Sequence, residues 1–311
     1  MINAEIVIGS RPEAFQEIVI GHYPNNEPLV KISEPWAKPN RSKMVEPYNI
    51  LLRPKTIGTF MAAMFYVDAL RERGYEIPNL IFPFALGARQ DRLNTSGDFL
   101  FTAKSIAKEI NMRNFPSVTV VDCHSEVMPA LIDRCRNVSL ALILRGLYPY
   151  THPIDKTLYD GVISPDAGAE KRASAVATGL GLPLYHGWKK RDVATGALNG
   201  FGVQELPMWS KSANRSNIGR PRFLVVDDIC DGGGTFVGIA KHITEYVVAC
   251  DLDLLVTHGL FSQSFSELYK HFDTIYTTDS IIRDLRDMNQ NVGGSFVKQI
   301  DICEPLLRGQ L

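Results

Sequence analysis

Short apolar runs that alternate with stretches of helical spacing constrain the fold of this chain most strongly. Each run is rich in β-branched and apolar residues and stops at a polar or glycine-containing loop. Strands that alternate with helices in this way are typical of parallel sheets with helices on both faces. The sequence predicts strands at 6–8, 48–52, 80–83, 117–121, 161–164, 223–226 and 252–257, and helices at 59–73, 101–110, 170–178, 235–246 and 265–271.

The length of the chain and a pattern that occurs twice predict two domains. At roughly 150 residues per domain, 311 residues suggest two cores. An apolar strand runs into Asp122 and His124 in the first half and into Asp227 and Asp228 in the second. We therefore expect two similar α/β domains, at residues 1–145 and 146–311, with the last residues able to pack back on the first domain.

Charge and hydropathy exclude several classes of partner. Lys and Arg together number 33 and Asp and Glu number 34, so no overall field attracts nucleic acid or an anionic membrane. No apolar run approaches the roughly 20 residues that span a bilayer, and the first residues lack a basic stretch before an apolar core. We expect a cytoplasmic protein without a nucleic-acid or membrane partner, in which a local site holds any anionic ligand.

The segment FLVVDDICDGGGT at 223–235 carries the strongest functional signal. Its glycines let successive backbone N–H groups point inward, and a helix that starts next adds its dipole, so the loop suits a phosphate. The paired carboxylates of Asp227 and Asp228 can accept hydrogen bonds from the neighbouring hydroxyls of a ribose. A simple tight turn between a strand and a helix would also account for the glycines. The proposed phosphate loop comprises Asp231, Gly232, Gly233, Gly234 and Thr235.

This segment resembles the PRPP-binding motif shared by type I phosphoribosyltransferases and PRPP synthetases, the ribose-phosphate diphosphokinases. In the first half, the letters ARQDR at 88–92 resemble a segment of the synthetases that the transferases lack. The resemblance implies that Arg89, Gln90 and Arg92 bind ATP, and the two guanidinium groups suit phosphate oxygens. It also implies two similar type I phosphoribosyltransferase-like domains, each a mostly parallel sheet flanked by helices, with ATP bound by the first and ribose phosphate by the second.

Three further segments match the synthetase family in the same order along the chain. VVDCHSE at 120–126 implies that His124 lies by the ATP phosphates and takes part in binding Mg²⁺. ISPDAGAEKR at 163–172 implies that Asp166 binds Mg²⁺, although Ala169 replaces a family glycine. YHGWKKRD at 185–192 resembles a flexible catalytic loop, with Lys189 and Arg191 as the active pair.

The segment HYPNNE at 22–27 aligns with a family segment that reaches the adenine of ATP across a subunit interface. The resemblance assigns ATP binding to Tyr23, Asn25 and Glu27, with Asn25 in place of an aspartate. An aromatic ring can stack on the base, and an amide oxygen can accept from its amino group. The resemblance therefore implies a homo-oligomer built on a dimer and leaves open whether the dimers assemble into hexamers.

The combined motifs predict Mg²⁺-dependent transfer of pyrophosphate from ATP to the C1 hydroxyl of ribose 5-phosphate, which gives PRPP and AMP for nucleotide biosynthesis. The family loop commonly reads DTGGT, and Gly232 replaces its threonine, which removes a hydroxyl and is expected to open space. The same chemistry on ADP-ribose or another 5-substituted ribose, as in NAD metabolism, is therefore a second hypothesis. A catalytically silent regulatory homologue and a nucleobase phosphoribosyltransferase are two more functions that these motifs leave open.

Overall fold

The computed structural model forms two compact units, and each is described by itself. The first unit comprises residues 1–139, 279–282 and 301–311, and the second comprises 140–278 and 283–300. The residues that the structure describes are 5–9, 16–25, 27–31, 48–93, 100–147, 154–191, 198–204, 220–246, 250–263, 266–281 and 296–311.

The first unit is built on a mostly parallel sheet. Its strand order is β2-β1-β5-β6-β7-β8 in the described residues, and the pairs from β5 to β8 are parallel whereas β1 is antiparallel to both of its neighbours. The strands are β1 (Ile6–Gly9), β2 (Gln16–Glu17), β5 (Asn49–Leu52), β6 (Asn79–Phe82), β7 (Val118–Val121) and β8 (Cys135–Val138). The helices are α1 (Ile57–Glu72), α2 (Thr102–Asn111), α3 (Val127–Leu131) and α8 (Cys303–Leu307), and a separate hairpin pairs β3 (Ile20–His22) with β4 (Pro28–Val30).

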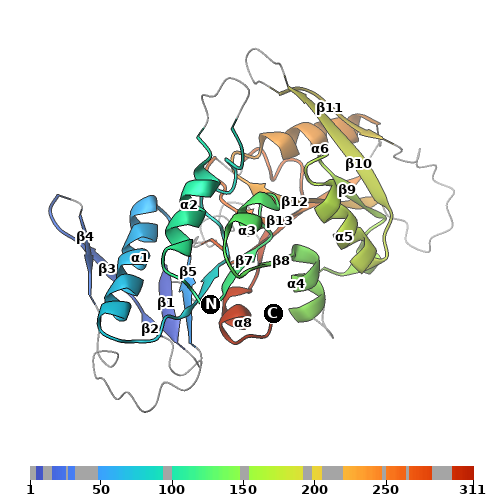
Figure 1. Ribbon diagram of the computed structural model, residues 1–311. Coiled ribbons are helices and arrows are strands. Elements are labelled where there is room, and N and C mark those ends of the chain that lie inside the picture. The colour runs from blue at the N-terminus through green and yellow to red at the C-terminus, as the bar shows by residue number, and fades with distance from the viewer. Residues whose placement is uncertain are drawn as a thin grey trace. The chain divides into compact units, whose positions relative to one another are not determined.

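The second unit has a longer sheet with the same parallel character. Its order is β11-β10-β9-β12-β13-β14-β15 in the part that the structure describes, and only the β10–β11 pair is antiparallel. The strands are β9 (Gly161–Ser164), β10 (Leu184–Arg191), β11 (Leu198–Gln204), β12 (Arg222–Cys230), β13 (Asp251–Gly259), β14 (Thr274–Thr278) and β15 (Val297–Ile300). The helices are α4 (Leu140–Leu147), the 3-10 turn η2 (Lys156–Leu158), α5 (Glu170–Leu180) and α6 (Gly234–Tyr246). The two mostly parallel sheets flanked by helices confirm the α/β prediction (Figure 1).

Side-chain and backbone caps explain where two of the helices begin and end. The Thr56 hydroxyl accepts the N–H of Thr59 at 3.1 Å, which satisfies an amide that has no partner in the first turn of α1. Gly181 ends a second helix, α5. It has φ 69°, and its N–H donates to carbonyls of the last turn of that helix. Glycine adopts this left-handed backbone at little cost, so it ends the helix cleanly.

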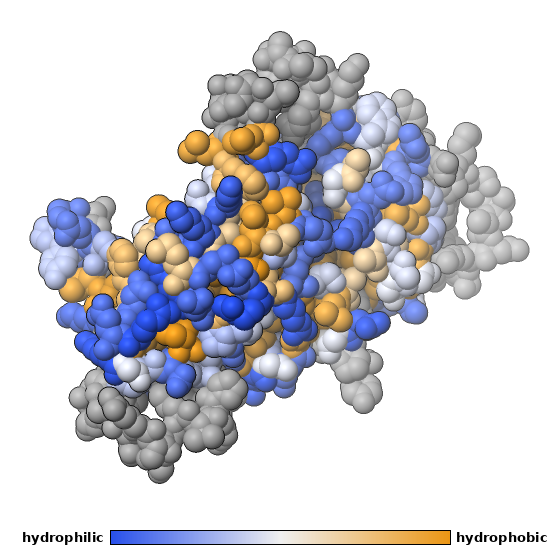
Figure 2. Space-filling model, in the orientation of Figure 1, coloured by the Kyte–Doolittle hydropathy of each residue, from blue (hydrophilic) through white to orange (hydrophobic). Residues whose placement is uncertain are grey.

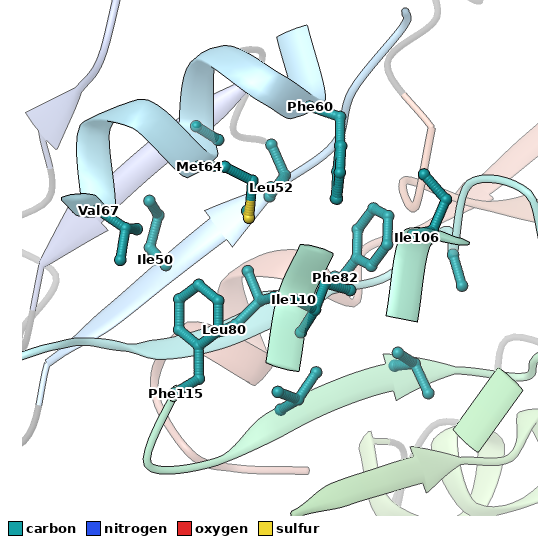
Figure 3. Close-up of a cluster of buried hydrophobic side chains, with 14 of the residues drawn as sticks. Ile50, Leu52, Phe60, Met64, Val67, Leu80, Phe82, Ile106, Ile110 and Phe115 are labelled. Carbon is teal, nitrogen blue, oxygen red and sulfur yellow. The ribbon is translucent and has the colours of Figure 1, made fainter. Parts of the chain in front are cut away.

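Apolar side chains from α1 and α2 pack on one face of the first sheet (Figure 3). Phe60 on α1 lies against Phe82 on β6, with ring centroids 5.9 Å apart. Both rings are fully buried, and truncation of such a ring costs about 3–5 kcal/mol of stability. The core also contains Ile50, Leu52, Met64, Val67, Leu80, Ile106, Ile110 and Phe115. This packing holds β6 and β7 in place, and the predicted ATP residues at 89–92 and His124 lie in the loops that follow these strands.

Two local expectations are wrong. Residues 266–271 form turns and not a helix. In this described segment, one hydrogen bond joins residues four apart, as in an α-helix: the Phe272 N–H donates to the Leu268 carbonyl at 2.9 Å. A single turn does not repay the cost of starting a helix. The segment at 185–191 is a strand, β10, and not a loop, because it pairs with β11. The composition of the segment does not show that it pairs with a second strand farther along the chain, from Arg191 with Leu198 to His186 with Gln204.

In the described residues, no helix combines the length and the apolar content that crossing a membrane requires. Figure 2 shows hydrophilic residues spread over much of the face that it draws, with hydrophobic residues interspersed among them.

Candidate active site

The candidate site of the second unit lies where neighbouring parallel strands end. β10, β9 and β12 are adjacent in the sheet (Figure 1). Asp166 follows β9, Asp227 and Asp228 lie in the last part of β12, and Lys189 lies on β10 beyond its pairing with β9. The carboxyl ends of parallel strands are where open α/β sheets bind ligands. The sheet order therefore brings four predicted site residues to one edge.

Asp227 and Asp228 form a buried acid pair that shares one arginine. Arg172 Nη1 lies 3.4 Å from Asp227 Oδ1 and 3.7 Å from Asp228 Oδ1, and all three side chains are at most 14% exposed. The Asp228 backbone N–H donates to Asp227 Oδ1 at 2.8 Å. Burial, followed by the negative charge of Asp228, raises the pKa of Asp227 well above its ordinary value, and Arg172 opposes that rise. A hydroxyl-rich ligand would find two close carboxyl groups already fixed in place.

Sequence reasoning missed the role of Arg172. The residue lies in the matched segment 163–172 but received no function, because a helix-borne arginine is usually exposed. It lies in the first turn of α5, the helix that follows β9, and reaches the strand next to β9. The signal available in the sequence was its position just after the turn that contains Asp166.

Asp166 is held by a turn and paired with the predicted catalytic lysine. Its Oδ1 accepts the backbone N–H groups of Gly168 at 2.8 Å and Ala169 at 3.1 Å. Its Oδ2 forms an ion pair with Lys189 Nζ. Ala169 has φ −83°, which any L residue adopts, so the replacement of the family glycine leaves the turn intact.

Lys189 reaches Asp166 because β10 passes close to the turn after β9. A side chain at Gly187 would collide with the backbone carbonyl of Ser164, so this approach requires glycine. The pairing with β11 shifts register between Lys190 and Arg191, so simple alternation of side chains does not decide which side Arg191 faces. The Arg191 backbone pairs with Leu198, and its side chain lies outside the described residues.

The loop before α6 has the backbone of an anion site. Gly233 has φ 78°, and its carbonyl accepts the Val237 N–H at 3.0 Å, which opens the helix. The first amides of a helix have no partner within it, and the helix dipole favours an anion there. Asp231 is held from the side, because its carboxylate accepts the Ser262 hydroxyl and its carbonyl accepts the Ser262 N–H at 3.1 Å. Gly232 is exposed and Thr235 is half-buried at the helix start.

The space expected beside Gly232 is occupied. A Cβ built on Gly232 would lie 3.2 Å from Cγ of Gln263, which is closer than ordinary van der Waals contact. Gln263 follows β13, the strand next to β12, so its approach depends on tertiary structure and not on local sequence. Gln263 therefore takes up space on this side of Gly232, while the glycine itself stays exposed.

In the first unit, the predicted ATP segment at 89–92 meets the turn after β7. Arg92 donates to both carboxylate oxygens of Asp91, at 2.7 Å and 3.0 Å. The hydrogen bonds from Arg92 and Ser125, together with the nearby His124, lower the pKa of Asp91 from 3.8 to about 2 against the effect of burial. Asp91 and Ser125 were not predicted as site residues, because their contact joins two loops far apart in the sequence.

Arg89 and Gln90 lie at the exposed side of the same loop. The Gln90 side-chain oxygen accepts the Thr102 hydroxyl, and the Gln90 carbonyl accepts the Ala103 N–H at 3.1 Å, so α2 holds the loop at its start. Gly87 has φ 83°, where a side chain would press on Thr102. These contacts hold the loop in place, and the side chains of Arg89 and Arg92 remain exposed.

Asp122 directs His124 outward through an uncommon backbone. Asp122 has φ 41°, in the left-handed region, and its N–H donates to the Val138 carbonyl at 2.9 Å. The next N–H, of Cys123, donates to Asn137 Oδ1 at 3.2 Å. A non-glycine residue in this region costs about 1–3 kcal/mol and persists where neighbouring contacts hold it, often at functional sites. His124 is exposed at the end of this turn.

The predicted adenine segment forms the tip of the β3–β4 hairpin. The Tyr23 N–H donates to the Glu27 carbonyl at 2.9 Å, and the Glu27 N–H donates to Asn25 Oδ1 at 3.3 Å. Tyr23 is 50% exposed, so the residue is accessible to a ligand, and an aromatic ring can stack on a base.

The predicted metal residues His124 and Asp166 lie in different units. Throughout the described ranges, no group of three or more His, Cys, Asp or Glu side chains is arranged to hold a metal ion. Mg²⁺ is usually held by one or two carboxylates together with substrate phosphates and water.

The fold of the chain is similar to that of a solved synthetase structure. The chain superposes on the phosphoribosylpyrophosphate synthetase of Mycobacterium smegmatis with a TM-score of 0.71 and 19% identity, over 94% of this chain and 88% of that one. The likeness defines the class of fold, a two-sheet α/β protein of the synthetase type.

Sequence relatives specify the family. No family model matches the chain. It is 30% identical over 217 residues to a ribose-phosphate pyrophosphokinase of Thermococcus kodakarensis, which covers 69% of this chain and 70% of the relative. It is 29% identical over 297 residues to a protein of the same name from Thermosipho africanus, with coverage of 90% and 82%. The chain belongs to the ribose-phosphate pyrophosphokinase family, whose chemistry is the transfer of a diphosphate group.

Proposed function

We propose that the protein transfers the β,γ-diphosphate of ATP to the C1 hydroxyl of ribose 5-phosphate, giving PRPP and AMP. The observation that carries the proposal is the second-unit site, where the acid pair, the glycine loop and the Asp166–Lys189 ion pair lie at one edge of the sheet. In the reaction the C1 oxygen attacks the β-phosphorus, the bond from that phosphorus to the α,β-bridging oxygen breaks, and AMP leaves with the bridging oxygen.

In this proposal the second unit binds the sugar. Asp227 and Asp228 accept hydrogen bonds from ribose hydroxyls, and the loop from Asp231 to Thr235 donates backbone N–H groups to the 5-phosphate. Lys189 and Arg191 supply positive charge to the transferred and leaving oxygens. The arrangement requires no covalent intermediate on the protein.

The first unit binds ATP in this proposal. Arg89 and Arg92 contact its phosphates, Gln90 contacts its base or ribose, and His124 lies by the triphosphate. Tyr23, Asn25 and Glu27 would complete the adenine site of a second copy, so the working form is a homo-oligomer built on a dimer. Mg²⁺, held through Asp166, His124 and the phosphates, would neutralise the triphosphate.

Product analysis tests this function. With ATP, Mg²⁺ and ribose 5-phosphate, we expect AMP and a C1-pyrophosphorylated sugar in equal amounts. Lys189→Ala should lower kcat at least about 100-fold, as loss of a group that stabilises developing charge does. The matched control is Lys241→Ala, which changes an exposed lysine on α6. ADP as the sole nucleotide product, or equal activity in the two variants, would contradict the proposal.

A further inference from the structure

A short segment after β13 forms a wall of the phosphate loop. The Phe261 N–H donates to the Cys230 carbonyl at 2.9 Å, and the Ser262 N–H donates to the Asp231 carbonyl at 3.1 Å. The Ser262 hydroxyl also donates to the Asp231 carboxylate. The segment at 261–263 therefore runs alongside the end of β12, and its backbone position is fixed by at least these bonds.

Phe261 anchors this wall. Its side chain is 1% exposed, and its φ of 45° lies in the left-handed region that non-glycine residues rarely adopt. Gly259 makes room for the ring, because a Cβ there would collide with it. Because Phe261 is buried, it fixes the backbone two residues before Gln263. The side chain of Gln263 is exposed.

Gln263 lies next to Gly232, the loop position at which the family loop commonly has a threonine. Its Cγ is 3.2 Å from where a Cβ of Gly232 would be, whereas a Cβ on Gly234 would meet nothing within 4 Å. The side-chain amide begins at the next carbon and carries two N–H donors. A threonine at position 232 would have brought one hydroxyl, and Gln263 offers an amide in the same neighbourhood.

We infer that Gln263 determines acceptor specificity, by donating to the 5-phosphate and by closing the flank of the loop beside Gly232. A phosphate monoester offers three terminal oxygens to the loop amides and to this side chain. In ADP-ribose, one of those oxygens is the bridge to the second phosphate and its nucleoside. In this inference the nucleoside would have to occupy the space beside Gly232 that Gln263 fills. The inference rests on the proposed function and specifies its acceptor as a compact 5-phosphorylated ribose.

Substitutions at the two facing positions test this pairing. Gln263→Ala should raise the KM and the Kd for ribose 5-phosphate about tenfold, the effect of losing one hydrogen bond to a charged group, while kcat changes little. The same variant should narrow the preference for ribose 5-phosphate over ADP-ribose. Gly232→Thr alone should also weaken binding, because its Cβ meets the Gln263 side chain. The double variant should bind better than Gly232→Thr alone, since the new hydroxyl then has room.

Gln310→Ala is the matched control, because it makes the same change at an exposed glutamine of the first unit, whereas the loop belongs to the second. Thermal unfolding of every variant checks that the fold is kept. An unchanged Kd and unchanged selectivity in Gln263→Ala, additive losses in the double variant, or a wild type that prefers ADP-ribose would each overturn the inference. Calorimetric Kd values for ribose 5-phosphate need no turnover, so they test Gln263 even if AMP formation fails and the proposed function falls.

Discussion

The two units treat a buried carboxylate of their candidate sites in opposite ways. In the first unit, Asp91 lies between Arg92 and Ser125, and its pKa falls to about 2. In the second, Asp227 lies against Asp228, with Arg172 farther away at 3.4 Å, and burial raises its pKa. The first arrangement is a fixed negative charge that orients a loop. The second holds two acids whose mutual repulsion Arg172 offsets only in part, so a ligand hydroxyl that donates to them would relieve it further.

The largest expected effect comes from removal of the shared arginine. Arg172→Ala leaves two buried carboxylates without this cation and should destabilise the protein by about 3–5 kcal/mol at neutral pH. Arg172→Lys should recover part of the loss, since it keeps the charge. Because Asp227 can take up a proton, the destabilisation should shrink as pH falls, as denaturant titrations at pH 7 and pH 5 would measure. A loss that is independent of pH would show that Arg172 matters for packing only.

Asp91→Asn should cost less, about 1–2 kcal/mol, because its partner Arg92 is 77% exposed and solvent screens the pair. The folded pKa of Asp91 lies below its ordinary value of 3.8, so its contribution is complete above about pH 4 and is lost as pH falls towards 2. The difference in unfolding free energy between wild type and variant should follow that course. The KM for ATP should rise as well, since Arg92 and the turn of His124 lose their common partner.

Asp227→Asn should have a smaller effect of opposite sign on stability. An acid whose folded pKa is raised opposes folding once the pH passes its unfolded pKa, so its ionisation destabilises the native state at neutral pH. An asparagine oxygen can still accept the Asp228 N–H. We therefore expect a Tm a few degrees higher at pH 7 and no gain at pH 4, together with a large loss of sugar turnover. A lower Tm at pH 7 would show that repulsion within the acid pair does not oppose folding.

The smallest expected effect on stability comes from an exposed ion pair, which serves as the reference for the buried ones. Lys270 and Glu267 form an ion pair in which both side chains are more than half exposed. Solvent screens exposed pairs of this kind, so Lys270→Ala should change the unfolding free energy very little. If this variant costs as much as Arg172→Ala, burial is not what distinguishes the acid pair.

The sequence predicted the ends of most of its strands to within two residues, because buried parallel strands are continuous apolar runs, but β12 continues through the acid pair to Cys230. Asp166, Asp227 and Asp228 directly follow or end such runs, so the strand pattern alone brought them to one sheet edge. The resemblance added Lys189, whose ion pair with Asp166 lies within the second unit.

What could not be predicted depends on contacts between segments distant in the sequence. Arg172 reaches a strand 55 residues away, and Gln263 lies over Gly232 only because β13 pairs with β12. Asp91 meets Ser125 across two loops. Each of these side chains is unremarkable in its local sequence, since propensity and periodicity describe near neighbours and not partners across a sheet.

The central claim is that the C1 oxygen of the sugar attacks the β-phosphorus of ATP. Ribose 5-phosphate labelled with ¹⁸O at the C1 hydroxyl tests it directly, with the products examined by mass spectrometry at short reaction times. We expect the label to bridge C1 and the diphosphate in the product, and AMP to carry none. Label in AMP, or its loss from the sugar product, would contradict the claim.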